Sequence, residues 1–212
     1  MNAGSALDIG CGTGSLLHEA RQAGHLGDLC GIDPGVGVLS LARTRPEITW
    51  ILGTLPQSAL NTKFELAVMT GHAFQAITSD SLIDKFLTDV RNCLTEGGLF
   101  AFESRNPLVR PWEKWIPERP AEVRLKDHSL VKIVTTVTSD FDGRTVSFRH
   151  DFLGEHPNLP LSSDSTLRFH HVEALARLLA KHGFAIEQQY GDFQSGDITH
   201  ESPEIITIAR RL

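Results

Sequence analysis

The sequence has no long apolar run, few cysteines and no excess of positive charge. No stretch approaches the roughly 18 apolar residues that a membrane-spanning helix needs. The N-terminus also lacks the charged region and apolar stretch of a secretory signal. The three cysteines, Cys11, Cys30 and Cys93, are scattered and form no C-x-x-C pair. These absences argue against a membrane protein, a disulfide framework and a redox motif, and we expect a cytoplasmic location.

The charge balance disfavours a general nucleic-acid surface. Lysine and arginine total 20 residues against 26 aspartates and glutamates, which gives a formal net charge of -6. Such a charge favours solubility and small or neutral substrates over nucleic acid. The 212 residues suffice for one substantial core but are too few for two full-sized domains. We therefore expect a single domain over residues 1–212, a small-molecule substrate and a monomer or homodimer.

Residues 6–100 alternate short apolar runs with helical patterns, as is typical of a parallel sheet with crossover helices. The pattern predicts strands at 6–9, 28–32, 48–52, 64–69 and 99–102. Helices are expected at 15–23, at 36–43 and over the apolar repeat from Leu82 to Leu94, with Glu96-Gly97-Gly98 ending the last of them. Near the C-terminus, a helix from Val172 to Gly183 and strands at 184–190 and 205–209 follow.

The intervening residues 107–165 follow another pattern. Residues 107–120 are rich in proline, tryptophan and charge and predict a crossing loop or short helix. Residues 130–138 and 145–153 alternate as strands do, on either side of an Asp142-Gly143 pair that is a hairpin signal. Residues 156–165 are expected to form a return loop. We therefore predict an antiparallel insertion over residues 107–165.

The first predicted strand leads into a loop with three glycines. Gly10, Gly12 and Gly14 occupy alternate positions where the chain must turn sharply and let a ligand approach the backbone. Asp33 ends the second strand, nineteen residues after Gly14, where a carboxylate can accept hydrogen bonds from both hydroxyls of a ribose. This combination favours a nucleotide-like cofactor over a tight turn without a ligand.

These segments resemble the motifs of class I S-adenosylmethionine-dependent methyltransferases. The stretch Leu7-Asp8-Ile9-Gly10-Cys11-Gly12-Thr13-Gly14 is similar to their first motif, and Gly31-Ile32-Asp33 is similar to their second. Residues 64–69 and 94–99 are similar to the fourth strand and the approach to the fifth. The resemblance implies a Rossmann-like α/β fold. Its seven-stranded, mostly parallel sheet would have the order 3-2-1-4-5-7-6, with helices on both faces and an antiparallel insertion after strand five as a substrate cover.

The resemblance also implies S-adenosylmethionine as cofactor and S-adenosylhomocysteine as product. Asp8 and the glycines would face the methionine part, and Asp33 the ribose. The full set of expected cofactor residues is Asp8, Gly10, Cys11, Gly12, Gly14, Asp33, Pro34, Thr54, Leu55 and Thr70. Thr54 stands where the family usually has an acid that bonds the adenine amine. The family also carries a helical lid before the first strand, where this chain has five residues, so we expect weak cofactor affinity.

A sulfonium methyl group is already activated, so the enzyme's main task is to hold the acceptor in line at close range. His72, after the fourth strand, is the candidate base because an imidazole titrates near neutral pH. Its alternative role is a polar contact to cofactor or substrate. The candidate substrate residues are His72, Phe74, Gln75, Arg105, Asn106, Trp112 and Trp115. The alternatives are core packing for Phe74, a surface ion pair for Arg105, and helix packing or an interface for the two tryptophans. No metal site is expected, since His170-His171 has no further ligand at suitable spacing.

The sequence leaves three functions to weigh. The first is methyl transfer to oxygen, nitrogen or carbon of a small molecule. The second is an NAD-dependent oxidoreductase, which Ser15 disfavours because the nicotinamide-type fingerprint has glycine there. The third is a cofactor-binding or interaction module without turnover, suggested by the short segment before the first strand and by Thr54.

Overall fold

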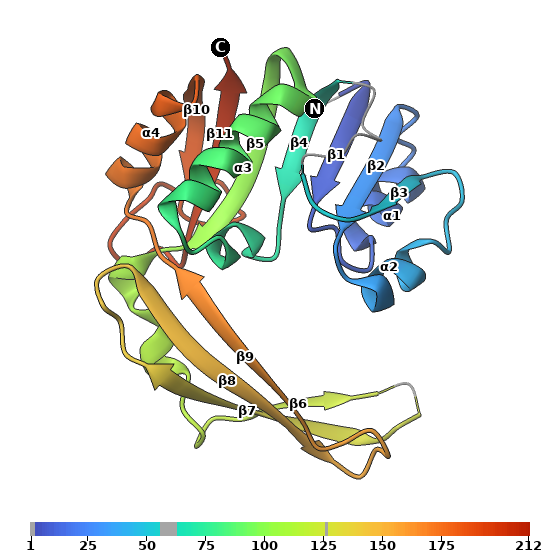
Figure 1. The fold of residues 1–212 in the computed structure, drawn as a ribbon, viewed down its shortest axis with the longest axis vertical. Helices are drawn as coiled ribbons and strands as arrows, with labels where there is room; N and C mark the ends of the chain where they lie inside the picture. The colour runs from blue at the N-terminus through green and yellow to red at the C-terminus, as the bar shows by residue number, and fades with distance from the viewer. Residues whose placement is uncertain (1–2, 56–62, 126) are drawn as a thin grey trace.

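The computed structural model describes residues 3–55, 63–125 and 127–212, which form two β-sheets, one above the other in Figure 1. The larger sheet has seven strands in the order β10-β11-β5-β4-β1-β2-β3. The smaller sheet has four strands in the order β6-β7-β8-β9. In Figure 1 the carboxyl ends of β1, β2, β4 and β5 point toward the smaller sheet.

The larger sheet has the predicted topology. Its strands are β1 (Ser5–Ile9), β2 (Asp28–Asp33), β3 (Thr49–Leu52), β4 (Phe64–Met69), β5 (Leu94–Arg105), β10 (Phe184–Tyr190) and β11 (Glu204–Arg211). The first five are parallel, whereas β11 runs antiparallel to both β5 and β10. This arrangement confirms the predicted order, with β11 and β10 in the last two positions.

Four α-helices of the described chain connect and cover these strands. They are α1 (Ser15–Gln22), α2 (Val36–Ala42), α3 (Asp80–Cys93) and α4 (Val172–Lys181). Three short 3-10 helices are η1 (Ala73–Ala76), η2 (Pro107–Val109) and η3 (Pro111–Lys114). Within the described residues, none of the helices is both long and apolar enough to cross a membrane.

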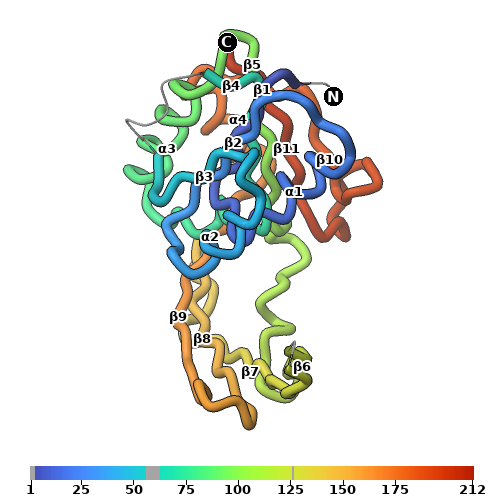
Figure 2. Tube along the Cα trace, turned by 90° about the vertical axis from the view of Figure 1, so that its right-hand side faces the viewer, coloured from blue at the N-terminus to red at the C-terminus, as the bar shows by residue number. Residues whose placement is uncertain are grey.

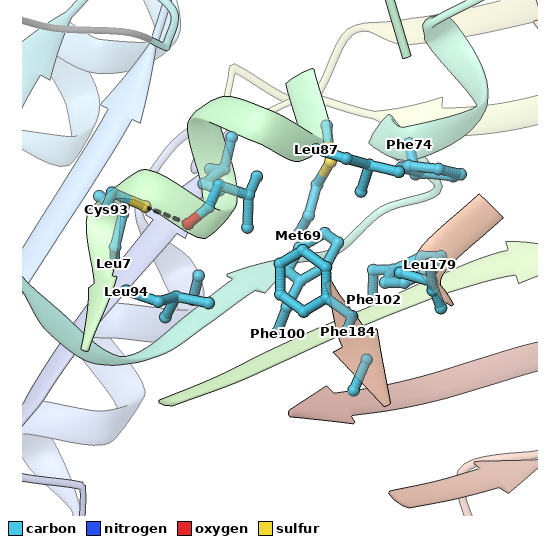
Figure 3. Close-up of a cluster of buried hydrophobic side chains, with 14 of the residues drawn as sticks. Leu7, Met69, Phe74, Leu87, Cys93, Leu94, Phe100, Phe102, Leu179 and Phe184 are labelled. Atoms are coloured by element: carbon cyan, nitrogen blue, oxygen red, sulfur yellow. Dashed lines mark hydrogen bonds between the residues drawn. The ribbon is translucent and has the colours of Figure 1, made fainter. Parts of the chain in front are cut away.

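The main core lies between the larger sheet and the helices α3 and α4. On α3 the buried residues Ile83, Leu87 and Val90 recur at spacings of four and three, which places them on one face of the helix. Figure 3 shows the cluster that they meet, in which Leu7, Met69, Phe74, Leu94, Phe100, Phe102, Leu179 and Phe184 gather. On the opposite face of the sheet, Leu17 of α1 packs against Ala6. Helices therefore cover both faces.

The start of β5 differs from the prediction. Leu94, expected on the apolar face of α3, is the first residue of β5 and pairs with Phe64 of β4. Residues 96–98 consequently lie inside the strand rather than ending the helix. Gly97, with a φ of 73°, lies in this stretch, and the register with β4 shifts between Phe64 and Leu66. Pairing with a buried neighbouring strand outweighs the helical spacing at this position.

The insertion after β5 forms the smaller, antiparallel sheet. Its strands are β6 (Ala121–Arg124), β7 (Leu130–Ser139), β8 (Thr145–Gly154) and β9 (Leu161–Arg168). The hairpin of β7 and β8 was predicted. The expected return loop over 156–165 is wrong in its second half, because residues 161–165 belong to β9 and pair with β8. The division of the chain at residues 107 and 165 stays a prediction.

An aromatic cluster anchors the smaller sheet at the end nearest the larger one. Buried Trp112, Val146 and Phe169 form its centre, and the Trp112 ring stacks 4.3 Å from that of Phe141. Figure 2 shows the two chain segments that link the sheets, one before β6 and the other after β9. The smaller sheet is therefore held by this cluster, by two connections and by Arg168 of β9, whose guanidinium binds the carboxylate of Asp80 on α3.

Candidate active site

In the glycine loop between β1 and α1, one glycine has empty space beside it and another is packed against a side chain. Gly10, Gly12 and Gly14 have φ values of 75°, 55° and 77°, a region that favours glycine. A Cβ added to Gly12 would meet nothing within 4 Å, whereas one on Gly14 would lie 2.4 Å from the ring of Trp50. The loop is therefore accessible at Gly12, while packing fixes Gly14.

Asp33, at the end of β2, holds this loop in place. Its Oδ2 accepts a hydrogen bond of 2.9 Å from the backbone N–H of Gly12, and its Oδ1 accepts one of 2.7 Å from that of Gly35. The residue is 9% exposed. Because each carboxylate oxygen has two lone pairs, both oxygens keep the capacity to accept another hydrogen bond.

Asp8, the last but one residue of β1, is a buried carboxyl group in an unfavourable setting. It is 1% exposed, and its Oδ1 has no hydrogen-bond partner among the described residues. Burial raises the pKa of Asp8 to about 7, and the charges of Asp33 and Glu103 add to the effect. An unpartnered buried oxygen is costly, so this carboxyl group is suited to a ligand that donates a hydrogen bond.

A cavity of about 590 Å³ opens beside the loop, within the range of small-molecule and cofactor sites. Gly10, Asp33, Pro34, Thr54 and Leu55 line it, so half of the expected cofactor residues come together there. The rest of its wall consists of Ile9, Ile32, Gly53, Met69, Ala73, Ala76, Ile77, Leu82, Lys85, Phe86 and Asp89. The contribution of α3 was missed, because nothing distinguishes its half-exposed residues in the sequence.

The other expected cofactor residues lie outside this lining. Asp8, Gly12 and Gly14 belong to the same strand and loop. Cys11 packs with Leu39 and Ala42, and burial, with the charges of Asp8 and Asp33, raises the pKa of its thiol to about 12. Thr70 is exposed after β4. Cys11 is thus a neutral packing residue whose backbone, rather than thiol, remains the candidate contact.

His72 follows β4 in a constrained position. Its φ of 60° is uncommon for a residue with a side chain, and its backbone N–H donates a 2.9 Å hydrogen bond to Oε1 of Glu103. The ring Nε2 lies 3.0 Å from both carboxylate oxygens of Glu204. The methyl group of the next residue, Ala73, would lie 3.4 Å from a Cβ on Gly10. The chain directly after His72 therefore lies beside the glycine loop, and the ring of His72 is held by a carboxylate.

Glu103 and Glu204 were not predicted from the sequence. Glu103 is 4% exposed and directly follows the apolar run 99–102 of β5, so the sequence around it gives no sign of its burial. Glu204 opens β11, 132 residues after His72 along the chain. It reaches the imidazole only because β11 lies next to β5 in the sheet.

Gln75 and Arg105 are joined by hydrogen bonds, and Arg105 pairs with Glu204 across β5 and β11. Gln75 is fully buried, and its Nε2 donates to the carbonyl of Arg168, while its Oε1 accepts from the backbone N–H and Nη1 of Arg105. Burial lowers the pKa of Arg105, and the charges of Glu204 and Glu103 oppose that shift. The Arg105 guanidinium lies 5.6 Å above the ring of Trp115. Arg105 and Trp115 thus remain candidates for substrate contact, whereas the buried Gln75 side chain holds Arg105 in place through hydrogen bonds.

Three of the expected substrate residues are occupied by structural roles. Phe74 is fully buried, with its ring 4.5 Å from that of Phe102. Asn106 donates to the carbonyls of Thr199 and Ser202 and accepts from the N–H of Leu108. Trp112 belongs to the aromatic cluster of the smaller sheet. Burial supports packing, the alternative weighed from the sequence, for Phe74 and Trp112, whereas the side chain of Asn106 binds backbone groups.

Comparison with known proteins points to one enzyme class. Residues 6–98 match the family model described as a methyltransferase domain. The matched range contains the glycine loop, Asp33 and His72. A search of curated proteins finds no significant match.

Solved structures with the same fold cover nearly the whole chain. The CcbJ methyltransferase from Streptomyces caelestis has 17% identity and a TM-score of 0.78 over 98% of this chain and 89% of its own. S-adenosylmethionine-bound CalS10, an amino pentose methyltransferase from Micromonospora echinaspora, has 20% identity and a TM-score of 0.71 over 99% and 84%. The sugar N-methyltransferase KedS8 from a Streptoalloteichus species has 16% identity and a TM-score of 0.74 over 100% and 81%. At these identities the likeness concerns the fold.

Proposed function

We propose that this chain is a class I S-adenosylmethionine-dependent methyltransferase and that it methylates oxygen, nitrogen or carbon of a small-molecule acceptor. The bound cofactor supplies an activated methyl group on a positively charged sulfur. Two proteins of similar fold are an amino pentose methyltransferase and a sugar N-methyltransferase by name, which supports an acceptor of small size. The net charge of -6 supports a partner other than nucleic acid.

The residues around the glycine loop fit this cofactor. The free lone pairs of Asp33 suit the two hydroxyls of a ribose, and the unpartnered Oδ1 of Asp8 suits an ammonium group. The open space at Gly12 allows a ligand to approach the backbone. We assign cofactor binding to Asp8, Asp33 and the backbone of the loop, with Pro34, Thr54 and Leu55 along the cavity.

The observation that carries the proposed chemistry is the His72–Glu204 pair, in which His72 directly precedes Ala73, the residue that lies against Gly10 of the glycine loop. With Nε2 donating to Glu204, the imidazole keeps its lone pair on Nδ1 and can take a proton from an acceptor there. The Glu204 carboxylate then stabilises the imidazolium that forms. We propose that His72 is the general base for a protonated acceptor and that Glu204 positions it.

A methyl-transfer assay with matched variants tests this assignment. S-adenosylhomocysteine formation is measured with the purified chain, S-adenosylmethionine and a panel of amines, hydroxylated rings and phenols. We expect His72→Gln to lower the transfer rate by roughly 100-fold or more and Glu204→Gln to lower it less. His200→Gln, at an exposed residue outside the site, is the control and should retain the rate.

Cofactor affinity separates a chemical role from a structural one. Both variants should bind S-adenosylhomocysteine as the wild type does, because neither side chain lines the cofactor cavity. Full activity in His72→Gln would remove the base from the mechanism. Cofactor binding without product from any acceptor would instead favour the module without turnover.

A further inference from the structure

The smaller sheet has two chemically different faces. Residues directly opposite one another on β7, β8 and β9 share a face, and three such rows follow one another along the strands. The rows are Val137–Phe148–Ser165, Thr135–His150–Ser163 and Ile133–Phe152–Leu161. We call this the aromatic face. It places a polar row between two rows that carry phenylalanine.

The opposite face is charged, and its polar groups bond to one another. Arg149 binds Asp164 through two hydrogen bonds of 2.9 and 3.0 Å, and Ser162 donates to Asp151. These residues alternate along β8 and β9 with those of the aromatic face. Such a face is suited to water, so any ligand of this sheet would bind the aromatic face.

The aromatic face is covered at one end and open at the other. Trp115 packs 4.8 Å from the ring of Phe148, which is 7% exposed. Toward the far end, His150 and Phe152 are half-buried and Leu161 is 56% exposed. In Figure 1 no α-helix of the described chain lies over this sheet. An apolar face left uncovered in this way marks a binding surface.

The covered end of the aromatic face adjoins the active site. Arg105, the last residue of β5, lies over Trp115, and the ring series continues from Phe148 to His150 at 4.9 Å and to Phe152 at 6.2 Å. Arg105 is also close enough to Glu204 for the charges to interact. A continuous series of side chains therefore leads from the partner of His72 onto the smaller sheet.

The polar row indicates the chemistry of the ligand. Thr135 Oγ1 lies 2.9 Å from Nδ1 of His150, which fixes the imidazole and leaves Nε2 for another partner. Ser163 adds a hydroxyl beside it. The three rows contain no lysine, arginine or carboxylate. A charged group would find no counter-charge there, and a purely apolar ring would cover the polar row without bonding to it.

On the premise of the proposed function, we propose that the aromatic face binds the non-reacting part of the acceptor and that this part is a hydroxylated ring, as in a sugar. Its apolar C–H face would pack on Phe152, with Phe148 and Trp115 toward the active site. Its hydroxyl groups would bond to His150, Thr135 and Ser163. Neighbouring rows lie two residues apart, about 7 Å along the strand, a distance that matches the width of one six-membered ring.

Binding measured without the methyl donor tests this proposal. The probes are glucosamine, galactosamine and mannosamine, with cyclohexylamine as the matched six-membered amine that lacks hydroxyl groups. Saturation-transfer NMR with the full chain and S-adenosylhomocysteine gives a Kd for each. We expect at least one amino sugar to bind, and cyclohexylamine to bind about fivefold or more weakly.

Variants on the two faces of β8 supply the controls. Phe152→Ala and His150→Ala should each raise the Kd of the bound sugar by about fivefold. Leu153→Ala, the next residue and 41% exposed on the opposite face, should leave it unchanged. Absence of sugar binding, equal binding of cyclohexylamine, or an equal loss in Leu153→Ala would each overturn the proposal.

The same variants separate this proposal from the proposed function. Phe152→Ala should retain the wild-type affinity for S-adenosylhomocysteine, measured by calorimetry, because Phe152 lies outside the cofactor cavity. If the wild type forms product but no amino sugar binds, the inference fails and the methyltransferase stands. If a sugar binds on the aromatic face and no acceptor is methylated, the sugar site stands, but the proposed function and the role of that sugar as acceptor both fail.

Discussion

The two sheets differ in how their apolar faces are covered. The larger sheet buries both faces under helices, and its candidate functional groups gather at the carboxyl ends of its strands. The smaller sheet has one charged face and one aromatic face, and a small cluster around Trp112 covers only part of the latter. The larger sheet thus provides the stable frame and the candidate cofactor site, whereas the smaller one leaves part of its aromatic face without a covering layer.

Removal of a buried aromatic ring from the main core should lower the free energy of unfolding more than any other change considered, because this core stabilises the whole larger sheet. Phe100 is fully buried, and its ring stacks 4.7 Å from that of Phe102. We expect Phe100→Ala to lower the free energy of unfolding by about 3–5 kcal/mol, measured by urea denaturation. Leu153→Ala on the smaller sheet is the matched control and should cost well under 1 kcal/mol. Equal losses would contradict the assignment of the main core.

The pH dependence of stability should also distinguish the sheets. The pKa of Asp8 is raised to about 7, so this carboxyl group stabilises the folded state fully below about pH 4, and that contribution is lost as the pH rises through 7. For a shift of this size the loss is roughly 4 kcal/mol. In the smaller sheet the hydrogen bonds and charge of Arg149 lower the pKa of Asp164, so its contribution is lost on acidification instead.

Denaturation at a series of pH values would measure this difference. Relative to Asp8→Asn, the wild type should lose stability between pH 4 and pH 8. A constant difference between the two proteins over this range would mean that Asp8 does not titrate there.

Truncation of Trp112 should lower the local stability of the smaller sheet and leave that of the larger sheet unchanged. Trp112 is 7% exposed and contacts the rings of Phe141 and Phe169. We expect Trp112→Ala to lower the free energy of local opening of β7 and β8 by roughly 3 kcal/mol. Hydrogen exchange should then accelerate in those strands while β4 and β5 stay protected. Uniform acceleration would show that the two sheets unfold as one unit.

A change at Gly12 should have the smallest effect on folding. Its backbone conformation disfavours a side chain, but an added Cβ would meet nothing within 4 Å. Gly12→Ala should therefore cost only about 1 kcal/mol of stability, while the methyl group obstructs the approach of a ligand to the loop. Gly14→Ala is the contrasting variant, because its Cβ would clash with Trp50 and lower stability much more. Similar unfolding curves for the two would contradict this distinction.

The sequence predicts the features that depend on neighbouring residues. The three glycines, the spacing of Ile83 and Leu87 and the Asp142-Gly143 turn each carry a local signal, and each of the corresponding elements is present. From them the order of the larger sheet followed through the family resemblance. Local patterns are sufficient here because the helices and the loop are stabilised within short segments.

Features that depend on distant pairing were missed. The strand β9 carries serines and Asp164, which resemble a loop in sequence but pair with Arg149 and its neighbours on β8. Glu204 meets His72 only through the order of the strands. Asn106 follows a strand, where a substrate residue is expected. Its side-chain amide instead donates to the carbonyls of Thr199 and Ser202, which are distant in the sequence. None of these partners can be identified from the residues beside them.

Calorimetric titration of the wild type and of Asp33→Ala with S-adenosylhomocysteine tests the central claim most directly. Asp33 ties the glycine loop to β2, lines the cavity, and has a carboxylate whose oxygens can each accept another hydrogen bond. The account predicts one-to-one binding by the wild type and a loss of about 1–3 kcal/mol in Asp33→Ala, with Asp28→Ala, an exposed residue at the other end of β2, as an unaffected control. Unchanged affinity in a folded Asp33→Ala protein, or no binding by the wild type, would contradict it.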